Sequence, residues 1–138
     1  MRMKVMCIRK TIKGMGIEEK GNFFPEWYDY GVIIGREYLV MGIVLYKYCV
    51  YPHYLIDNDG APHWYPYMLF EITNKKLPAE WYIDALGDTR GGNIRALIGF
   101  KELCADENFH DDLIVEGEEY ALQIYRQRKA ELFGDYFD

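Results

Sequence analysis

Apolar and turn-forming residues alternate along the first half of the chain in a way that predicts short strands. The apolar runs lie at residues 3–8, 32–48, 54–56 and 69–72. In the first run Val5 and Cys7 fall on the same face, because side chains along a strand alternate between faces. Asp59-Gly60 predicts a hairpin turn, because glycine tolerates a positive φ. Several short strands separated by turns are typical of a small β-barrel.

Residues 11–30 interrupt this pattern with three glycines and a proline. The same segment carries five aromatic residues, which are Phe23, Phe24, Trp27, Tyr28 and Tyr30. A loop with so much apolar surface is unfavourable in water, so we expect it to fold back onto the body of the protein.

The second half of the chain predicts further strands and one long helix. Residues 81–84 and 93–100 read as two strands on either side of a glycine-rich loop at 87–92. In the second of these, Ile94, Ala96 and Ile98 alternate with the intervening residues, which predicts an edge or half-buried strand.

Residues 113–133 predict an amphipathic helix with Arg126, Arg128 and Lys129 near its end, where cations suit the helix dipole. Its inward stripe consists of Ala121, Ile124, Tyr125, Arg128 and Leu132. Asp111 or Asp112 is placed to cap its start; alternatively, Gly117 marks a later start.

Four motifs in the first half resemble small bacterial SH3-like barrel domains. They are Gly-Arg-Glu-Tyr-Leu-Val at 35–40, Tyr-Leu-Ile-Asp-Asn-Asp-Gly at 54–60, Trp-Tyr-Pro at 64–66 and Phe-Glu at 70–71. The resemblance implies a barrel over residues 3–73 and a binding role, and it carries no catalytic residue over. The expected fold is therefore α+β, a single domain over residues 1–138. In it, residues 74–138 add strands and a C-terminal amphipathic helix to an SH3-like small β-barrel.

Length and composition exclude several classes of protein. A chain of 138 residues with 13 Tyr, 7 Phe and 3 Trp can bury one substantial core and is not a disordered segment. Residues 1–10 lack the apolar run of a secretory signal, and no run approaches the 18 apolar residues of a membrane span. The cysteines at 7, 49 and 104 are odd in number and far apart, which disfavours a disulfide framework. We expect a reduced, cytoplasmic protein without a membrane partner.

Negative charge is concentrated in the second half of the chain. Sixteen basic and 22 acidic residues give a net charge of −6, which disfavours nucleic acid as a partner. Residues 1–69 hold 8 basic and 7 acidic side chains, whereas residues 70–138 hold 8 basic and 15 acidic ones. Residues 102–119 contain eight acidic side chains and no lysine or arginine. This segment is either a solvated surface or a patch for a basic partner.

Aromatic residues are also in excess between positions 46 and 67, where only Lys47 could meet a phosphate, so a protein ligand is favoured over RNA or DNA. The expected partner-binding residues are Asp106, Glu107, Asp111, Asp112, Glu116, Glu118, Glu119, Trp64 and Tyr65. The chain is small and acidic and has no recognisable set of catalytic residues. In these respects it looks like a cytosolic immunity protein or antitoxin of the bacterial polymorphic-toxin kind. Such a protein blocks a basic toxin domain by stoichiometric binding.

Two other functions remain open. The carboxylates between Asp106 and Asp112, together with His110, could bind a hard cation or a small ligand, or serve a small enzyme. No known ligand register, nucleophile elbow, zinc-protease motif or phosphate-binding loop is present, so we assign no catalytic residue, metal or cofactor. A structural accessory subunit is the third possibility, and it predicts a constitutive oligomer.

Overall fold

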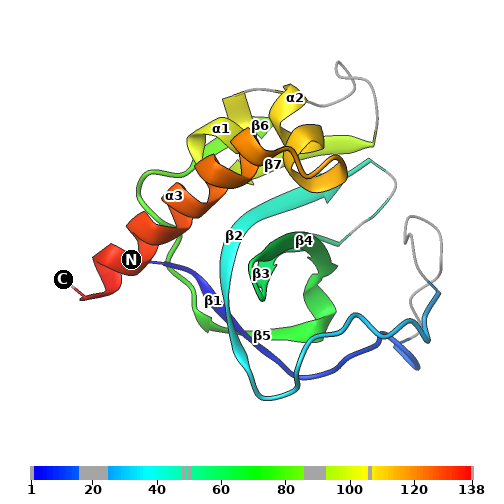
Figure 1. Cartoon of the computed structure of the whole chain (residues 1–138). Helices are drawn as coiled ribbons and strands as arrows, with labels where there is room; N and C mark the ends of the chain where they lie inside the picture. Colours follow the sequence, from blue (N-terminus) through cyan, green and yellow to red (C-terminus); the bar gives the residue numbers. More distant parts are fainter. Residues whose placement is uncertain are drawn as a thin grey trace.

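The computed structural model describes residues 2–15, 25–47, 49, 51–85, 93–105 and 107–137 (Figure 1). Over these ranges the chain forms an α+β fold, in which seven antiparallel strands make an open sheet and three helices follow the last strand. The strands are β1 (Lys4–Cys7), β2 (Glu37–Tyr46), β3 (His53–Asn58), β4 (Ala61–Pro66), β5 (Phe70–Asn74), β6 (Tyr82–Ala85) and β7 (Ile94–Gly99). The helices are α1 (Lys101–Ala105), α2 (Glu107–His110) and α3 (Glu119–Phe137), with a 3₁₀ turn at Tyr67–Leu69 and a π-helical turn at Asp111–Val115.

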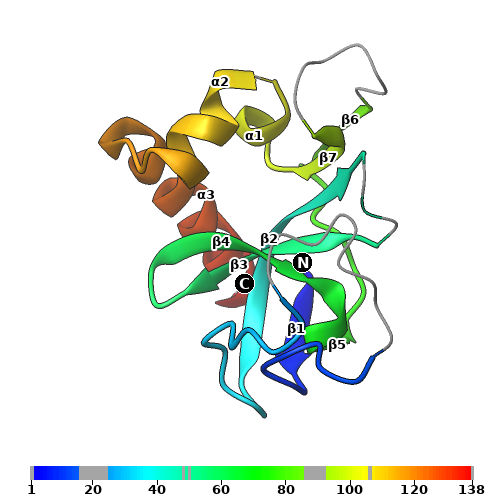
Figure 2. The ribbon, with the colours of Figure 1, turned by 90° about the vertical axis from the view of Figure 1, so that its right-hand side faces the viewer.

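The sheet branches at β2, its longest strand. One edge of β2 pairs with β3, which pairs in turn with β4. The other edge is shared, because residues 37–39 pair with β1 and residues 42–46 pair with β7. β5 then adds to β1, and β6 adds to β7 (Figure 2). Within the sheet, β2 is therefore the strand that connects β1 and β3–β5 with β6 and β7.

The middle of β2 is buried on both faces. Val40 packs with Val5, Ile56 and other apolar side chains of the first half of the chain. The next residue, Met41, points to the opposite face and packs with side chains of the helical region. The sheet thus separates two cores, one enclosed by the early strands and one covered by α1 and α3 (Figure 1).

Most of the expected strands are confirmed, and so is the hairpin turn. Asp59 and Gly60 both have positive φ, of 53° and 88°, between β3 and β4. β6 and β7 correspond to the two strands expected after residue 80. The expectation that β7 is an edge or half-buried strand is wrong, because β7 pairs with β2 on one side and β6 on the other. The alternation of apolar residues predicts that Leu97 faces solvent. Leu97 is instead fully buried, because Cys104 of α1 covers its face of β7. The loop at 87–92 lies outside the described residues.

The long loop folds back over its described parts, as expected. The N–H of Tyr30 donates to the carbonyl of Lys10 at 3.1 Å. Ile12 and Tyr30 are buried in the first core, whereas Trp27 is exposed. Phe23 and Phe24 lie outside the described residues.

The C-terminal helix is confirmed, with a later start than residue 113. Gly117 has a φ of 64°, a left-handed conformation that ends the π-helical turn, and α3 begins at Glu119. The stripe of Ala121, Tyr125 and Leu132 is buried in the second core, as the spacing predicts. None of the described helices combines the length and the apolar character that crossing a membrane requires.

Candidate functional site

Five acidic residues lie in the π-helical turn, in the bend that follows it and at the start of α3, and together we call them the acidic face. It comprises Asp111, Asp112, Glu116, Glu118 and Glu119. Two backbone hydrogen bonds fold this segment into a compact bend: the N–H of Glu116 donates to the carbonyl of Asp111 at 2.9 Å, and that of Glu118 to the carbonyl of Asp112 at 2.8 Å. The bend therefore brings the backbone of Glu116 and Glu118, on either side of Gly117, close to that of Asp111 and Asp112.

Three of the five carboxylates have partners within the protein. Asp111 accepts a hydrogen bond from His110 Nδ1 at 3.0 Å, and Asp112 accepts one from the hydroxyl of Tyr120. Glu119 forms an exposed ion pair with Arg126 at 3.2 Å.

Glu116 and Glu118 differ from these three. Both are exposed, and within the described part of the chain no ion pair engages either of them. Their charge is therefore open to solvent and to any partner that approaches this end of α3.

Two apolar side chains are exposed among these carboxylates. Val115, the last residue of the π-helical turn, is 68% exposed, and Tyr120 on the first turn of α3 is 49% exposed. Large exposed apolar side chains rimmed by charge are typical of protein-interaction surfaces. The acidic face thus combines long-range attraction with local apolar contact area.

A hydrogen bond between two rings ties the acidic face to the sheet. Trp64 Nε1 on β4 donates to His110 Nε2 at 3.0 Å, and the two rings stack. Because the indole nitrogen is only a donor, Nε2 must be the acceptor and the proton of the neutral imidazole lies on Nδ1, facing Asp111. Trp64 therefore links the acidic face to β4 through His110.

The remaining expected site residues, Tyr65, Asp106 and Glu107, do not join the acidic face in the described structure. Tyr65 is 5% exposed and lies in the first core, because neighbouring residues of a strand point to opposite faces and Trp64 occupies the other one. Asp106 lies outside the described residues. Glu107 begins α2, and its side chain is likewise outside them. We therefore leave Tyr65 out of the candidate surface.

The alternative cation site, at Asp106–Asp112 with His110, has no support in the described geometry. Both ring nitrogens of His110 already take part in hydrogen bonds, so a metal ion would have to displace Trp64 or Asp111. In the described ranges no group of three or more His, Cys, Asp or Glu side chains is arranged to hold a metal ion.

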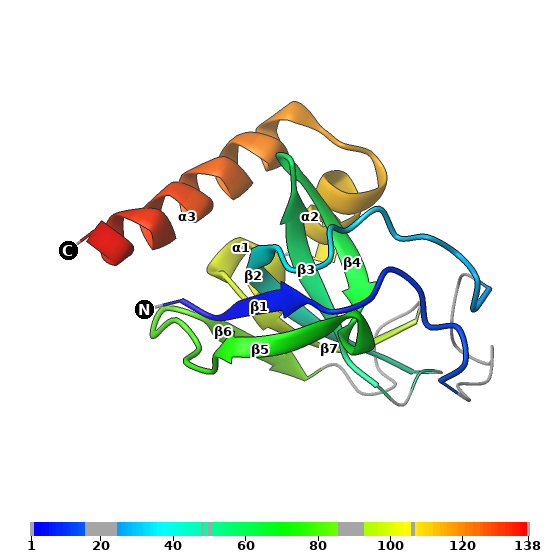
Figure 3. The same cartoon turned by 90° about the horizontal axis from the view of Figure 1, so that it is seen from below.

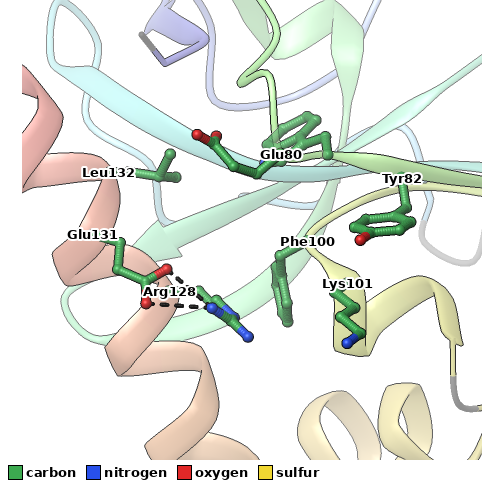
Figure 4. A pocket seen from close by; sticks show the side chains of 8 residues that line it. Glu80, Tyr82, Phe100, Lys101, Arg128, Glu131 and Leu132 are labelled. Carbon is green, nitrogen blue, oxygen red and sulfur yellow. Dashed lines mark hydrogen bonds and ion pairs between the residues drawn. The ribbon is translucent and has the colours of Figure 1, made fainter.

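A pocket of about 390 Å³ lies between α3 and the start of α1 (Figure 4). Phe100, Leu132 and other apolar side chains line it, and Glu80 and Lys101 add charge. Arg128 is bound by carboxylates on both sides: Nε and Nη2 donate to Glu102 at 2.8 and 2.6 Å, and Nη1 donates to Glu131. These bonds lower the pKa of Glu102 and raise that of Arg128. The pocket joins residues far apart in the sequence and has no sequence signature.

A second polar cluster fixes the other side of α3. Tyr125, on the buried face of α3, donates its hydroxyl proton to Asp57 Oδ2 at 2.5 Å, and Lys129 lies 3.1 Å from Asp57 Oδ1. Burial raises the pKa of Asp57, but the hydrogen bonds from Tyr125, Lys129 and the N–H of Gly60 outweigh it, so the net shift is downward. Figure 3 shows the β3–β4 hairpin reaching α3 at this point. The middle of α3 is thus held by polar contacts on both sides, to α1 through Arg128 and to β3 through Tyr125 and Lys129.

Comparison with known proteins finds no family model, no curated protein and no solved structure that matches this chain.

Proposed function

We propose that this protein is a protein-binding module whose acidic face binds a basic protein. The observation that carries the proposal is the arrangement of Glu116 and Glu118, two exposed carboxylates without an ion pair in the described structure, next to Val115 and Tyr120. Charges of this kind accelerate encounter with a cationic partner, and apolar side chains between them slow its dissociation. The rigid attachment through Trp64 lowers the entropic penalty of binding.

The class of partner that we propose is a toxin domain with a basic cleft, so that the chain acts as an immunity protein or antitoxin in the cytoplasm. Small size and a net charge of −6 are consistent with this role. The three cysteines are free and buried, which agrees with a reducing compartment.

We also propose that β1 to β5 form an SH3-like barrel that serves as the scaffold. The support is the order β4-β3-β2-β1-β5, the 3₁₀ turn between β4 and β5, and the division of β2 between two sets of strands. On this scaffold, β6, β7 and the helices are additions that carry the binding surface.

The test compares two charge-reversal pairs in the full-length protein. Glu116→Lys with Glu118→Lys changes the acidic face, whereas Glu26→Lys with Glu71→Lys makes the same change in charge at exposed sites outside it. Partners captured by the tagged wild-type protein from extracts of the source organism are identified by mass spectrometry. Their association with the three proteins is then measured by biolayer interferometry at 50, 150 and 500 mM NaCl.

We expect a basic partner whose association rate falls at least tenfold at 50 mM NaCl in the acidic-face variant and less than threefold in the control. The difference should shrink at 500 mM NaCl, because salt screens exposed charges. Equal rates for the two variants would remove the acidic face from the mechanism. A partner that is itself acidic would contradict the proposed partner class.

A further inference from the structure

β6 is an edge strand of the sheet. Among the described strands it pairs only with β7, and Figure 2 shows it as the outermost strand on that side. Tyr82 is 53% exposed, Ile83 is 68% exposed, and Ala85 is also exposed. An edge strand directs every second pair of N–H and C=O groups away from its neighbour, so β6 offers a template for a further strand.

The side chains of β6 fall on two faces with different chemistry. Asp84 pairs with Leu97, whose side chain packs against Cys104 of α1, so Asp84 and Tyr82 lie on the face that carries α1. Ile83 and Ala85 lie on the opposite face. Within the described structure neither the Tyr82 hydroxyl nor the Asp84 carboxylate is hydrogen-bonded to another side chain.

We propose that β6 pairs antiparallel with β6 of a second copy of this chain, about a twofold axis at Ile83. In this register Ile83 lies opposite Ile83 of the second copy, and Tyr82 lies opposite Asp84 of the second copy. The hydroxyl is a donor and the carboxylate an acceptor, so the same complementary pair forms on each side of the axis. This is the self-complementarity that a twofold interface requires.

The alternation of side chains along the strand favours this register over one shifted by one residue. A slip by one residue would place Ile83 opposite Asp84 of the second copy, an apolar side chain against a carboxylate, and would put the two α1 faces on opposite sides of the joined sheet. The centred register keeps both α1 faces on one side and matches apolar with apolar residues.

Self-association through β6 is independent of the proposed function. The two interactions are expected to respond in opposite directions to the salt concentration. Each copy carries a net charge of −6, so raising the salt concentration strengthens pairing between copies. It weakens binding of a basic partner by the acidic face.

The test uses variants with one added cysteine. Oxidised glutathione promotes disulfide formation between two copies, and non-reducing electrophoresis measures the rate of this cross-linking. The native cysteines are all buried. Ile83→Cys places two thiols directly across the axis, where opposite Cα atoms lie about 4.5–5.5 Å apart, within disulfide range. Ala85→Cys on the same strand places them four residues apart, about 13 Å along the strand. Ile34→Cys is an exposed control elsewhere, 58% exposed in the native protein.

We expect Ile83→Cys to cross-link at least tenfold faster than either control at 100 µM protein. Sedimentation equilibrium up to 500 µM should show a dimer that Ile83→Lys weakens at least tenfold and Ile34→Lys leaves unchanged. Equal cross-linking rates, rapid cross-linking of Ala85→Cys, or a monomer at every concentration would each overturn the pairing. So would β6 amides that gain protection from exchange only when a different protein is added.

Discussion

Gly42 and Gly99 lie opposite each other where β2 pairs with β7, and the side chain of Leu103 fills the space above both. A β-carbon on either glycine would lie 2.8 Å from Leu103 Cδ2 and 3.2 Å from a backbone carbonyl of the facing strand. The absence of two side chains therefore allows α1 to sit directly on the sheet at the junction of the two halves of the chain.

Gly42→Ala is expected to destabilise the fold by about 1–3 kcal/mol, because the added methyl group overpacks a closed site. Leu103→Ala alone is expected to be destabilising by about 2–5 kcal/mol, since Leu103 is buried. The double variant should be more stable than the sum of the two effects, because the smaller side chain makes room for the methyl group. Urea denaturation of the four proteins measures this coupling, and strict additivity would show that Leu103 is not the obstacle.

His53 is expected to make stability depend on pH between about 6.5 and 4. Burial lowers the pKa of His53 to about 4, while the nearby carbonyl of Tyr51 opposes that shift. The unfolded chain therefore takes up a proton near pH 6.5 that the folded chain does not, and stability falls by about 3 kcal/mol as the pH drops to 4. His53→Phe keeps a ring beside Tyr46 and Tyr51 and should remove this slope in urea titrations at pH 7, 6, 5 and 4.

Asp57 is expected to act at lower pH. Its pKa in the folded chain is below the ordinary value of about 3.9, so the ionised carboxylate stabilises the fold at neutral pH. That contribution is lost as the pH falls from about 4 through the folded-state pKa. Asp57→Asn should lower the stability at pH 7 by about 1–3 kcal/mol, because Tyr125 and Lys129 lose a charged partner, and should flatten the curve below pH 4.

Glu71→Gln, at an exposed site on β5, is the control for Asp57→Asn and should leave both stability and its pH dependence unchanged. A similar loss in both variants would show that the effect comes from net charge. The buried cluster around Asp57 would then be unimportant.

Local features of the fold were predictable from the sequence, and long-range pairings were not. Asp59-Gly60 indicates its turn because only a few residues adopt positive φ, and the stripe of Ala121, Tyr125 and Leu132 indicates the buried face of α3. The placement of β7 beside the second half of β2 depends on Gly42 and Gly99 meeting across about 57 residues, for which no local pattern exists.

The candidate site was predictable to the same extent. The acidic residues of the acidic face were predictable, because the charge of a side chain follows from its residue type. Aromatic excess alone could not distinguish Trp64, which faces His110, from Tyr65, which faces the core. Pairing of Glu102 with Arg128 likewise required the packing of α3 against α1.

Val115 is expected to affect dissociation of the basic partner that we propose, rather than association. Val115→Ser removes apolar contact area and leaves every carboxylate of the acidic face in place. The dissociation rate should rise about three- to tenfold, while the association rate changes less than twofold. Leu77→Ser, at an exposed position away from the acidic face, is the control. Surface-sensor kinetics with the captured partner distinguishes the two rates, and a change confined to association would contradict an apolar contact at Val115.

Trp64→Phe is expected to loosen the acidic face without unfolding the sheet. The variant keeps an aromatic ring beside His110 but removes the N–H donor to Nε2, so a nitrogen of the buried His110 ring loses its partner. Hydrogen exchange followed by mass spectrometry should show at least tenfold faster exchange in residues 107–116, with β2 and β3 unchanged. Tyr67→Phe changes an exposed ring in the adjoining 3₁₀ turn and should have no such effect. Uniformly faster exchange across the chain would show that Trp64 acts through global stability, and the acidic face would then not depend on this hydrogen bond.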